Sequence, residues 1–496
     1  MSGTFDDKDR QAIPRCLDYS TACALDLLRI IRKQEKAHKT EVQSSRARQE
    51  WQNNPSLNTA VDLVAEALIV KEFESEDAIK AAHHILRKAP TSSRLIRELA
   101  NHFLEEPSLG KIEIGPITER DIGHECVAPL RKSVRAYPIN PIAWSDLALA
   151  HATLGQVDKA RLAMEVALSL GRSNRFILRS ASRCFVHIGE PDRAIAILNR
   201  SGLCPFDPWI ASAEIAISES TGLKSKFISK ARNLVQDENL TQFSRSELTV
   251  GIGTMEIKNG SARRAKTLLR QALRDPTENA LAQAEWMAKQ LGTDSPNIVK
   301  LGAKVPASYE AQARHFYYNK QFVESVKASE MWSRFQPLSS EPIILSSFLA
   351  SLCLNDDAEA LRILNSSMPA QRNDPLLINN YAFSLARSGN VAAAVQALRK
   401  VNFHVLSDRQ KSILTATQGF ISFRTDNVEQ GRKLYSMAVR GFELSNNLRS
   451  AAIAAYCWAV EEERIGSPYA ESLVGDAKGR ITRFNVFELE DLAKRL

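Results

Sequence analysis

The feature that most constrains the fold of this chain is a punctuated pattern that recurs every 34 residues. In residues 140–171, small and apolar residues recur three, four and seven positions apart on both sides of Gly155, which predicts two amphipathic helices joined by a tight turn. Asp158 is expected to cap the second helix. Gly189 follows Gly155 by 34 residues, and Ala194 follows Ala160 by the same interval. Because one such hairpin cannot bury its apolar faces alone, the pattern predicts a stack of hairpins.

Further copies occur along the chain, at Gly260 with Ala265, at Gly389 with Ala394, and at Gly419, Gly431, Tyr435 and Ala438. A helix–turn–helix unit of this period, with these small residues, resembles the tetratricopeptide repeat (TPR) family over roughly residues 60–480. The resemblance implies an all-α fold, a right-handed α-solenoid of stacked helix–turn–helix repeats. A helical N-terminal segment lies outside the repeat.

The repeat pattern predicts five parts of the chain: a basic helical N-terminal segment at 1–58, a first half-array at 59–291, a linker at 292–308, a second half-array at 309–480 and a C-terminal capping helix at 481–496. The linker is either a hinge between the half-arrays or a surface crossing. Residues 107–121 interrupt the first half-array, either as a functional loop or as a plain insertion. The sequence does not decide between these alternatives for the linker and for residues 107–121. It does not determine the oligomeric state either.

Composition indicates a folded, cytoplasmic protein. The chain is 44% hydrophobic and has no apolar run near the roughly 20 residues that a membrane span needs. Its start is acidic and polar, unlike a secretory signal, and its seven cysteines are scattered, which is typical of reduced thiols. The net charge of +8 permits a nucleic-acid partner without requiring one.

No motif for catalysis, cofactor binding or metal binding stands out. The phosphate-binding glycine loop, His-Glu-x-x-His, Gly-x-Ser-x-Gly and zinc-type cysteine and histidine spacings do not occur. His83 and His84 are adjacent, so on a helix they point about 100 degrees apart and do not share a metal easily. We therefore expect a protein that is not an enzyme and carries no cofactor.

Candidate partner-binding residues follow from the resemblance, which implies a groove lined by the first helix of each repeat. In one repeat the groove positions carry Arg179 and Arg183, preceded by Arg172 and Arg175. An arginine pair suits a carboxylate or phosphate, although the arginines could equally be solvated or ion-paired. Some TPR proteins clamp a peptide's terminal carboxylate with residues from successive repeats. This chain departs from that pattern, since it has Ser145, Leu149, Ser212 and Ala216 at the neighbouring groove positions.

A second candidate patch comprises Glu310, Arg314, Tyr317 and Tyr318, and analogous positions farther along hold Asn379 and Arg387. Tyrosine and arginine are typical of interface hot spots, but Glu310 and Arg314 also have the spacing of a helical ion pair. Near the N-terminus, seven basic residues lie between Arg29 and Arg48. They would attract nucleic acid or an acidic protein, or would simply be solvated.

Two functions fit these observations. The first is a non-enzymatic scaffold or adaptor that binds partner proteins along the solenoid groove. A narrower version, based only on where such arrays often occur, makes it a sensor or regulatory subunit of a bacterial multiprotein system such as antiviral defence. The second is a nucleic-acid-binding solenoid that uses the basic N-terminal helix and the arginine stripe from Arg172 to Arg183.

Overall fold

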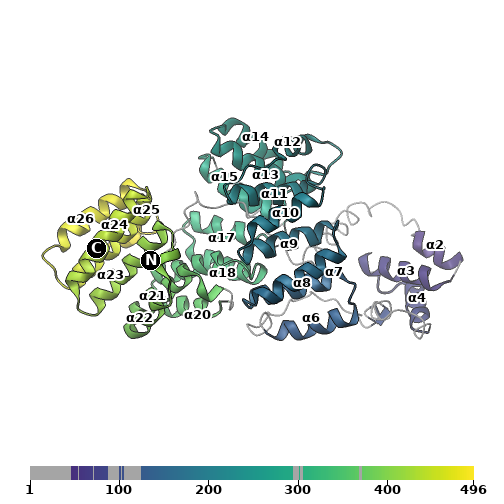
Figure 1. The fold of residues 1–496 in the computed structure, drawn as a ribbon, viewed down its shortest axis with the longest axis horizontal. Helices are drawn as coiled ribbons and strands as arrows, with labels where there is room; N and C mark the ends of the chain where they lie inside the picture. The colour runs from purple at the N-terminus through teal and green to yellow at the C-terminus, as the bar shows by residue number, and fades with distance from the viewer. Residues whose placement is uncertain are drawn as a thin grey trace. The chain divides into compact units, whose positions relative to one another are not determined.

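The computed structural model describes residues 46–53, 55–70, 72–87, 100–101, 103–104, 124–293, 301, 305, 307–367 and 371–496. Helices are the only regular secondary structure in these parts of the chain (Figure 1). The described residues divide into two compact units, one within 46–104 and one within 124–496.

The described residues of the smaller unit include the helices α2 (Arg46–Asn53), α3 (Leu57–Val70) and α4 (Glu76–Arg87), with further helical residues at 100–101 and 103–104. Trp51, Leu63 and Ile85 meet in its own apolar core together with Phe103. The predicted first half-array at 59–291 is therefore divided between the two units. Residues 1–45, which hold most of the predicted basic N-terminal segment, and the 107–121 insertion lie outside the described residues.

The larger unit begins with a helix and then a series of helix hairpins. Its first part comprises α6 (His124–Ala136), α7 (Pro141–Thr153), α8 (Val157–Leu170), α9 (Arg175–His187), α10 (Pro191–Arg200), α11 (Pro208–Ser220), α12 (Ile228–Gln236), α13 (Gln242–Lys258), α14 (Ala262–Ala272) and α15 (Glu278–Gln290). Its second part comprises α17 (Tyr309–Tyr318), α18 (Phe322–Phe335), α19 (Glu341–Phe348), the π-helical turn η1 (Leu349–Cys353), α20 (Asp357–Asn365), α21 (Pro375–Arg387), α22 (Val391–Arg399), α23 (Asp408–Arg424), α24 (Val428–Leu444), α25 (Leu448–Arg464), α26 (Ala470–Arg483) and α27 (Glu490–Ala493). Short 3₁₀ turns lie at η2 (Gln371–Asn373) and η3 (Phe403–Val405).

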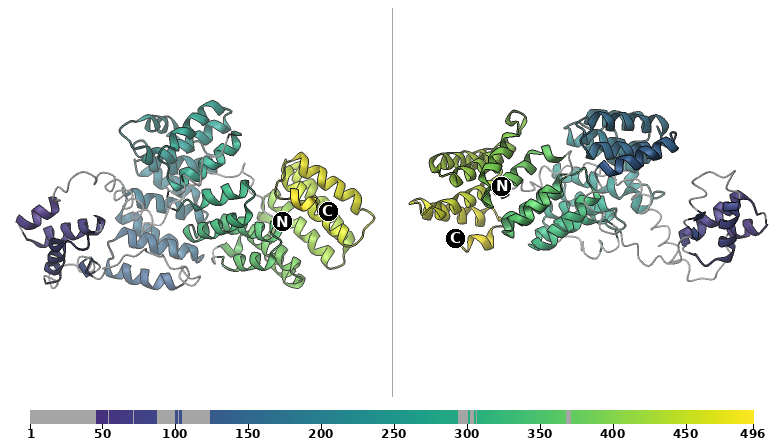
Figure 2. Two further views of the ribbon diagram at one scale, coloured as in Figure 1. Left: turned by 180° about the vertical axis from the view of Figure 1, so that it is seen from behind. Right: turned by 90° about the horizontal axis from the view of Figure 1, so that it is seen from below.

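The hairpins stack in chain order. The first helices α7, α9, α11, α13 and α15 contact one another in succession and form what we call the first-helix layer. Each second helix contacts its own partner and the first helix of the next hairpin, as α8 does with α7 and α9. The same arrangement continues from α19 through α21 and α23 to α25, and the antiparallel pairs are visible in all views (Figures 1 and 2). The predicted all-α solenoid of stacked hairpins is thus confirmed.

The turns inside the hairpins explain the glycine spacing. Gly155, Gly189, Gly260 and Gly389 all have positive φ, between 70° and 88°, where glycine is favoured because it lacks a Cβ. One detail of the prediction is wrong: Asp158 does not cap α8. The N-cap of α8 is Gln156, without a side-chain cap, and Asp158 lies in the first turn.

Two other glycines allow close packing of α23 on α24. A Cβ on Gly431 would lie 2.5 Å from Cδ2 of Phe423, and a Cβ on Gly419 would lie 3.1 Å from the ring of Tyr435. Phe423 and Tyr435 are both fully buried. The sequence places glycine at these positions because the neighbouring rings fill the space that a side chain would need.

The predicted linker does not separate two independent bodies. Leu281 of α15, Val305 and Ala311 of α17 belong to one apolar cluster, and α15 and α17 are in direct contact. Residues 294–300, 302–304 and 306 of the linker lie outside the described residues. The packing of α15 on α17 argues against a free hinge at this point.

A long-range contact ties the turn between α18 and α19 to the first hairpins. Leu338 in this turn is buried in the apolar core that α6 to α11 otherwise form. Residues Leu147, Met164 and Phe185 are members of the same core. Hairpins far apart in the sequence therefore share one core.

The C-terminal hairpins are joined by a buried ion pair. Arg432 of α24 donates from Nε to Oε1 of Glu462 at 2.7 Å and from Nη2 to Oε2 at 2.9 Å. Glu462, on α25, is fully buried and also accepts a hydrogen bond from Nε1 of Trp458 at 3.0 Å. This two-point contact fixes α24 against α25.

The prediction of one capping helix at 481–496 is wrong. Helix α26 ends at Arg483, and Asn485 has a φ of 49°, which breaks the helix. Val486 and Leu489 are then buried away from solvent, and α27 is only a single turn. The break allows the chain to bury these residues instead of continuing as an amphipathic helix.

Candidate partner-binding surface

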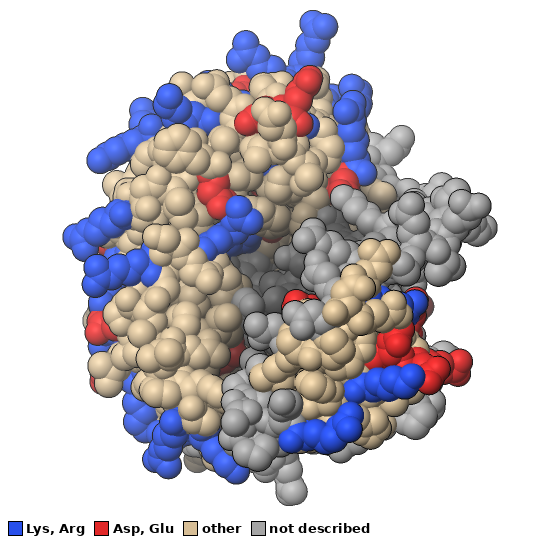
Figure 3. Space-filling view, turned by 90° about the vertical axis from the view of Figure 1, so that its right-hand side faces the viewer, with Lys and Arg blue, Asp and Glu red and all other residues tan. Residues whose placement is uncertain are grey.

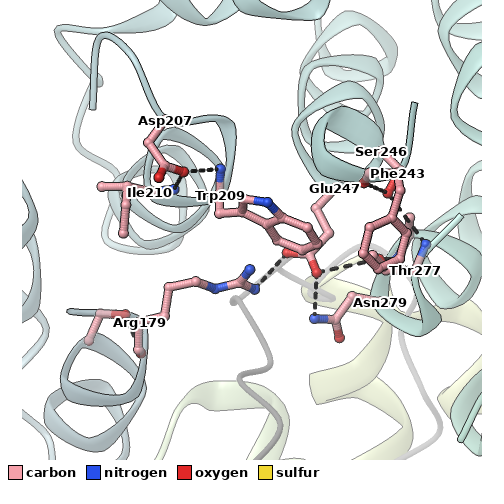
Figure 4. Close-up of polar contacts among 11 residues, drawn as sticks. Arg179, Asp207, Trp209, Ile210, Phe243, Ser246, Glu247, Thr277 and Asn279 are labelled. Carbon is pink, nitrogen blue, oxygen red and sulfur yellow. Dashed lines mark hydrogen bonds and ion pairs between the residues drawn. The ribbon is translucent and has the colours of Figure 1, made fainter. Parts of the chain in front are cut away.

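The predicted arginine stripe lies on and just before α9, in the first-helix layer. Arg175 is the first residue of α9, and its Nε lies 2.5 Å from Oδ2 of Asp207. Asp207 is the N-cap of α11 and accepts hydrogen bonds from the backbone N–H groups of Trp209 (2.9 Å) and Ile210 (3.3 Å) (Figure 4). Arg175 therefore pairs with a carboxylate that also caps α11, the first helix of the next hairpin.

Arg179 reaches across the layer from α9 to α13. Its Nη2 lies 2.7 Å from Oε2 of Glu247, and the two side chains are 12% and 7% exposed. The other oxygen of Glu247 accepts hydrogen bonds from Oγ1 of Thr277 at 3.3 Å and from Nδ2 of Asn279 at 3.2 Å (Figure 4). Glu247 thus joins α9, α13 and α15 through one largely buried carboxylate.

Two partly exposed aromatic rings lie beside this network. The Arg179 guanidinium lies 4.8 Å from the centre of the Trp209 ring, a cation–π distance. Trp209 meets Phe243 of α13 edge to face, with ring centres 5.4 Å apart (Figure 4). The indole N–H of Trp209 has no acceptor in the described part of the chain. The ring is therefore held by two contacts, while part of its surface is exposed and its N–H donor has no described acceptor.

Sequence reasoning missed Trp209, Glu247 and Asn279, although a signal for them exists. Trp209 precedes Gly222 by 13 residues, and Glu247 and Asn279 precede the turn glycines Gly260 and Gly292 by the same interval. They occupy one structural position in three successive hairpins. Aligning the repeats on the turn glycines, instead of considering only the groove positions of Arg179 and Arg183, would have found them.

The other two arginines of the stripe differ sharply in exposure. Arg172 is exposed in the turn before α9, whereas Arg183 is only 8% exposed. Burial, with a smaller contribution from the charge of Arg183, lowers the pKa of His187 to about 4. Of the four predicted arginines, two are therefore ion-paired, one is buried and only Arg172 is exposed without a described ion pair.

The second predicted patch contributes to packing. The side chain of Arg314 is 2% exposed, with Nε 2.9 Å from Oε1 of Glu310 and Nη2 2.8 Å from Oε2 of Glu341. Tyr317 is also buried, and only Tyr318 of this patch is partly exposed. The prediction of an open patch is corrected on this point, because both members of the expected helical ion pair are held inside the hairpin.

The last two predicted residues also make internal contacts. Asn379 is fully buried and accepts a hydrogen bond from Oγ1 of Thr417 at 2.7 Å, which links α21 to α23. The Nε of Arg387 lies 2.9 Å from Oδ2 of Asp357 in α20. Burial removes Asn379 from any surface, and Arg387 is already neutralised.

Three further properties of the described residues bear on function: their surface charge, their metal-binding groups and the apolar character of their helices. In the face drawn in Figure 3, basic side chains of the described residues are spread around the surface, with acidic and uncharged residues between them. Within the described ranges, no group of three or more histidine, cysteine or carboxylate side chains is arranged to hold a metal ion. None of the helices that the structure describes combines the length and the apolar character needed to cross a membrane.

Comparisons with known proteins leave the chain without an assigned family. No protein-family profile matches it, and no curated protein sequence matches it. Among solved structures, the chain is similar to yeast Tom70, with 14% identity over 88% of this chain and 95% of that chain and a TM-score of 0.31. It is also similar to the APC/C hetero-tetramer Cut9–Hcn1, with 12% identity over 90% of this chain and 91% of that chain and a TM-score of 0.38. A third similar structure is the human IFIT1 dimer with PPP-AAAA, with 11% identity over 86% of this chain and 95% of that chain and a TM-score of 0.32. Identities and TM-scores this low carry no argument about function.

The class of protein follows from the chain's own helix geometry. Successive hairpins, left-handed glycine turns and a continuous layer of first helices define a TPR-like α-solenoid.

Proposed function

We propose that this protein is a non-enzymatic scaffold that binds a partner protein on the first-helix layer around Trp209. The observation that carries the proposal is the partly exposed pair of Trp209 and Phe243, which is held beside the polar network of Arg179 and Glu247. Tryptophan and arginine are enriched at interface hot spots, and a rigid aromatic ring loses little conformational entropy when a partner covers it. The indole N–H of Trp209 would donate a hydrogen bond to the partner and would thereby orient it on this surface.

The internal polar contacts support recognition of a protein more than of a phosphate backbone. Arg175 and Arg179 already face carboxylates, and Glu247 places its carboxylate at the centre of the surface. A nucleic acid would have to displace these carboxylates and would leave Glu247 buried beside phosphate, which is unfavourable. The nucleic-acid alternative is therefore weakened, because Arg175 and Arg179 of the arginine stripe are already paired with carboxylates.

Affinity purification of the tagged full chain tests the proposal. We expect a stoichiometric protein partner that survives nuclease treatment and that Trp209→Ala loses. Removal of a hot-spot tryptophan typically costs about 2 kcal/mol, or roughly 30-fold in Kd. Arg200→Ala is the matched control, because Arg200 is exposed at the end of α10.

Two results would contradict the proposal. One is a partner that Trp209→Ala and Arg200→Ala retain equally well. The other is co-purification of nucleic acid alone, with binding that weakens steeply as salt increases. The narrower assignment to a bacterial defence system stays a hypothesis, because the described surfaces have no feature that distinguishes one pathway from another.

A further inference from the structure

A second recognition surface is formed by residues of α15, α17 and α25, and the end of the described chain already occupies it. After α26, residues 484–496 turn back at Asn485, and we call these residues the C-terminal segment. Val486, Phe487, Glu488 and Leu489 are all buried. The side chains of Phe487 and Glu488 contact Tyr317 of α17 and Arg449 of α25, which precede them by far in the sequence.

The centre of this contact is the dipeptide Phe487–Glu488. Tyr317 donates its hydroxyl hydrogen to Oε1 of Glu488, and Arg449 pairs with the same oxygen. Arg449 also donates from Nη2 to the hydroxyl oxygen of Tyr317 at 3.1 Å. Tyr317 and Arg449 therefore form one donor pair that recognises a single buried carboxylate.

The aromatic ring of Phe487, next to this carboxylate, also contacts Arg449 and Tyr317. The ring of Phe487 lies 4.7 Å below the guanidinium of Arg449, and its centre is 5.2 Å from that of Tyr317. Nζ of Lys289, from α15, lies 5.9 Å from the same ring. The same two residues, Tyr317 and Arg449, thus bind both the ring and the carboxylate.

Charge complementarity extends beyond the dipeptide. Lys320, which follows α17, pairs with Glu490 at the start of α27. Lys289, Lys320 and Arg449 are basic, whereas the occupant carries Glu488, Glu490 and Asp491. The receiving surface is therefore cationic and aromatic, and residues 487–491 of the segment are acidic and aromatic, whereas Lys494 and Arg495 follow them.

We propose that Tyr317, Arg449 and Lys289 form a docking site for a partner-protein segment in which an aromatic residue is followed directly by a carboxylate. The C-terminal segment holds this site in cis, and the partner segment displaces it. Tyr317 and Arg449 lie on α17 and α25, outside the first-helix layer, and only Lys289, on α15, lies on a helix of that layer. The inference therefore goes beyond the proposed function.

The hydrogen bonding of the bound segment is incomplete, which favours its displacement by a competing segment. Oε2 of Glu488 is buried without a hydrogen-bond partner among the described residues, so the fit in cis is incomplete. The contacts are concentrated between Val486 and Glu490, just after the helix break at Asn485. A partner segment that satisfied the second carboxylate oxygen would gain a hydrogen bond that the resident segment lacks.

A labelled peptide tests the site in trans. The probe is a fluorescent peptide of residues 484–496, measured by anisotropy against the full chain. We expect the double variant Phe487→Ala/Glu488→Gln to bind this peptide at least about tenfold more tightly than wild type, because the resident segment no longer competes. A second peptide, with Phe-Glu in an otherwise glycine- and serine-rich context, should bind the same variant more weakly but measurably.

Further substitutions locate the binding. Adding Arg449→Gln to the double variant should weaken peptide binding at least about tenfold, as should replacing Phe or Glu in the peptide. Arg440→Gln, on the exposed side of α24, is the matched control and should leave binding unchanged. Circular dichroism checks that each variant is folded.

Several outcomes would overturn the proposal. They are absence of peptide binding, binding that is indifferent to Arg449, and failure of the glycine- and serine-rich peptide. Peptide-reversible dimers seen by light scattering would make a second copy the occupant and would equally overturn it. If the double variant does not fold, hydrogen exchange of the wild-type chain with excess peptide decides: faster exchange in 486–493 supports displacement, and unchanged exchange refutes it.

Discussion

Replacing Arg432 by methionine should destabilise the C-terminal hairpins more than any ordinary surface substitution. Methionine keeps most of the apolar stem, so the change mainly removes the guanidinium that binds both oxygens of Glu462. Glu462 is fully buried on α25, and Trp458 would then be one of its few remaining donors. The variant leaves a desolvated carboxylate that its surroundings no longer compensate.

The expected magnitude follows from this burial. Breaking a fully buried ion pair by removing one partner costs about 3–5 kcal/mol. The Arg432 side chain is 21% exposed, so water screens part of the interaction, and we expect about 2–3 kcal/mol. Adding Glu462→Gln should recover part of this loss, because a neutral amide is cheaper to bury and still accepts from Trp458.

Urea unfolding followed by circular dichroism, with hydrogen exchange of α24 to α26, measures the effect. Arg440→Met is the matched control on the same helix and should change the free energy of unfolding by less than about 0.5 kcal/mol. Equal destabilisation by Arg432→Met and Arg440→Met would refute the reasoning. So would a double variant that is less stable than Arg432→Met alone.

The same ion pair predicts a pH dependence. Burial raises the pKa of Glu462, but hydrogen bonds from Arg432, Ser467 and Trp458 outweigh burial and the pKa lies below its ordinary value. The carboxylate therefore stabilises the fold above the unfolded pKa of about 4.3, and this contribution is lost as the pH falls through the folded-state pKa. The difference between wild type and Arg432→Met should shrink on acidification.

Further predictions concern two helical glycines and two buried ionisable side chains. Gly431→Ala should destabilise by about 1–3 kcal/mol because its Cβ meets Phe423, whereas Gly475→Ala, in open space on α26, should stabilise by about 0.5–1 kcal/mol, both measured by urea unfolding. The pKa of about 4 at His187, against about 6.5 in the unfolded chain, predicts that stability falls as the pH drops from 6.5 towards 4, by up to roughly 3 kcal/mol, and that His187→Gln flattens this loss in a pH series. Burial raises the pKa of Glu214, so its ionisation opposes folding at neutral pH, and Glu214→Gln should be neutral or stabilise by about 1 kcal/mol in thermal melts at pH 7.

The repeat architecture was predictable because local periodicity determines it. Gly155 and Gly189 mark turns that require positive φ, and that requirement is visible in the sequence itself. The later turns were harder to detect, since Lys320, Asn355 and Asp426 take the left-handed conformation in place of glycine. Their side chains tolerate this conformation at some cost, so the pattern fades without the turn disappearing.

The candidate sites were less predictable because they depend on contacts between hairpins. The sequence indicates that Arg179 lies on a first helix, but not that Glu247, 68 residues later, neutralises it. Likewise, a tyrosine and arginine patch around Tyr317 indicates an interface without revealing that Glu488, 171 residues later, already fills it. Periodicity identifies the face of a helix, whereas the curvature of the stack decides which faces meet.

The burial of Leu338 among the first hairpins has a mechanical consequence. An array in which every hairpin touched only its neighbours would lengthen gradually under tension, one hairpin after another. Here the turn after α18 is anchored in the core of α6 to α11, so the intervening hairpins form a loop closed by tertiary contact. If the two ends of this unit were pulled apart, the residues between α11 and Leu338 would carry no tension as long as Leu338 stayed in the core. Once Leu338 left the core, these residues would extend together in a single step.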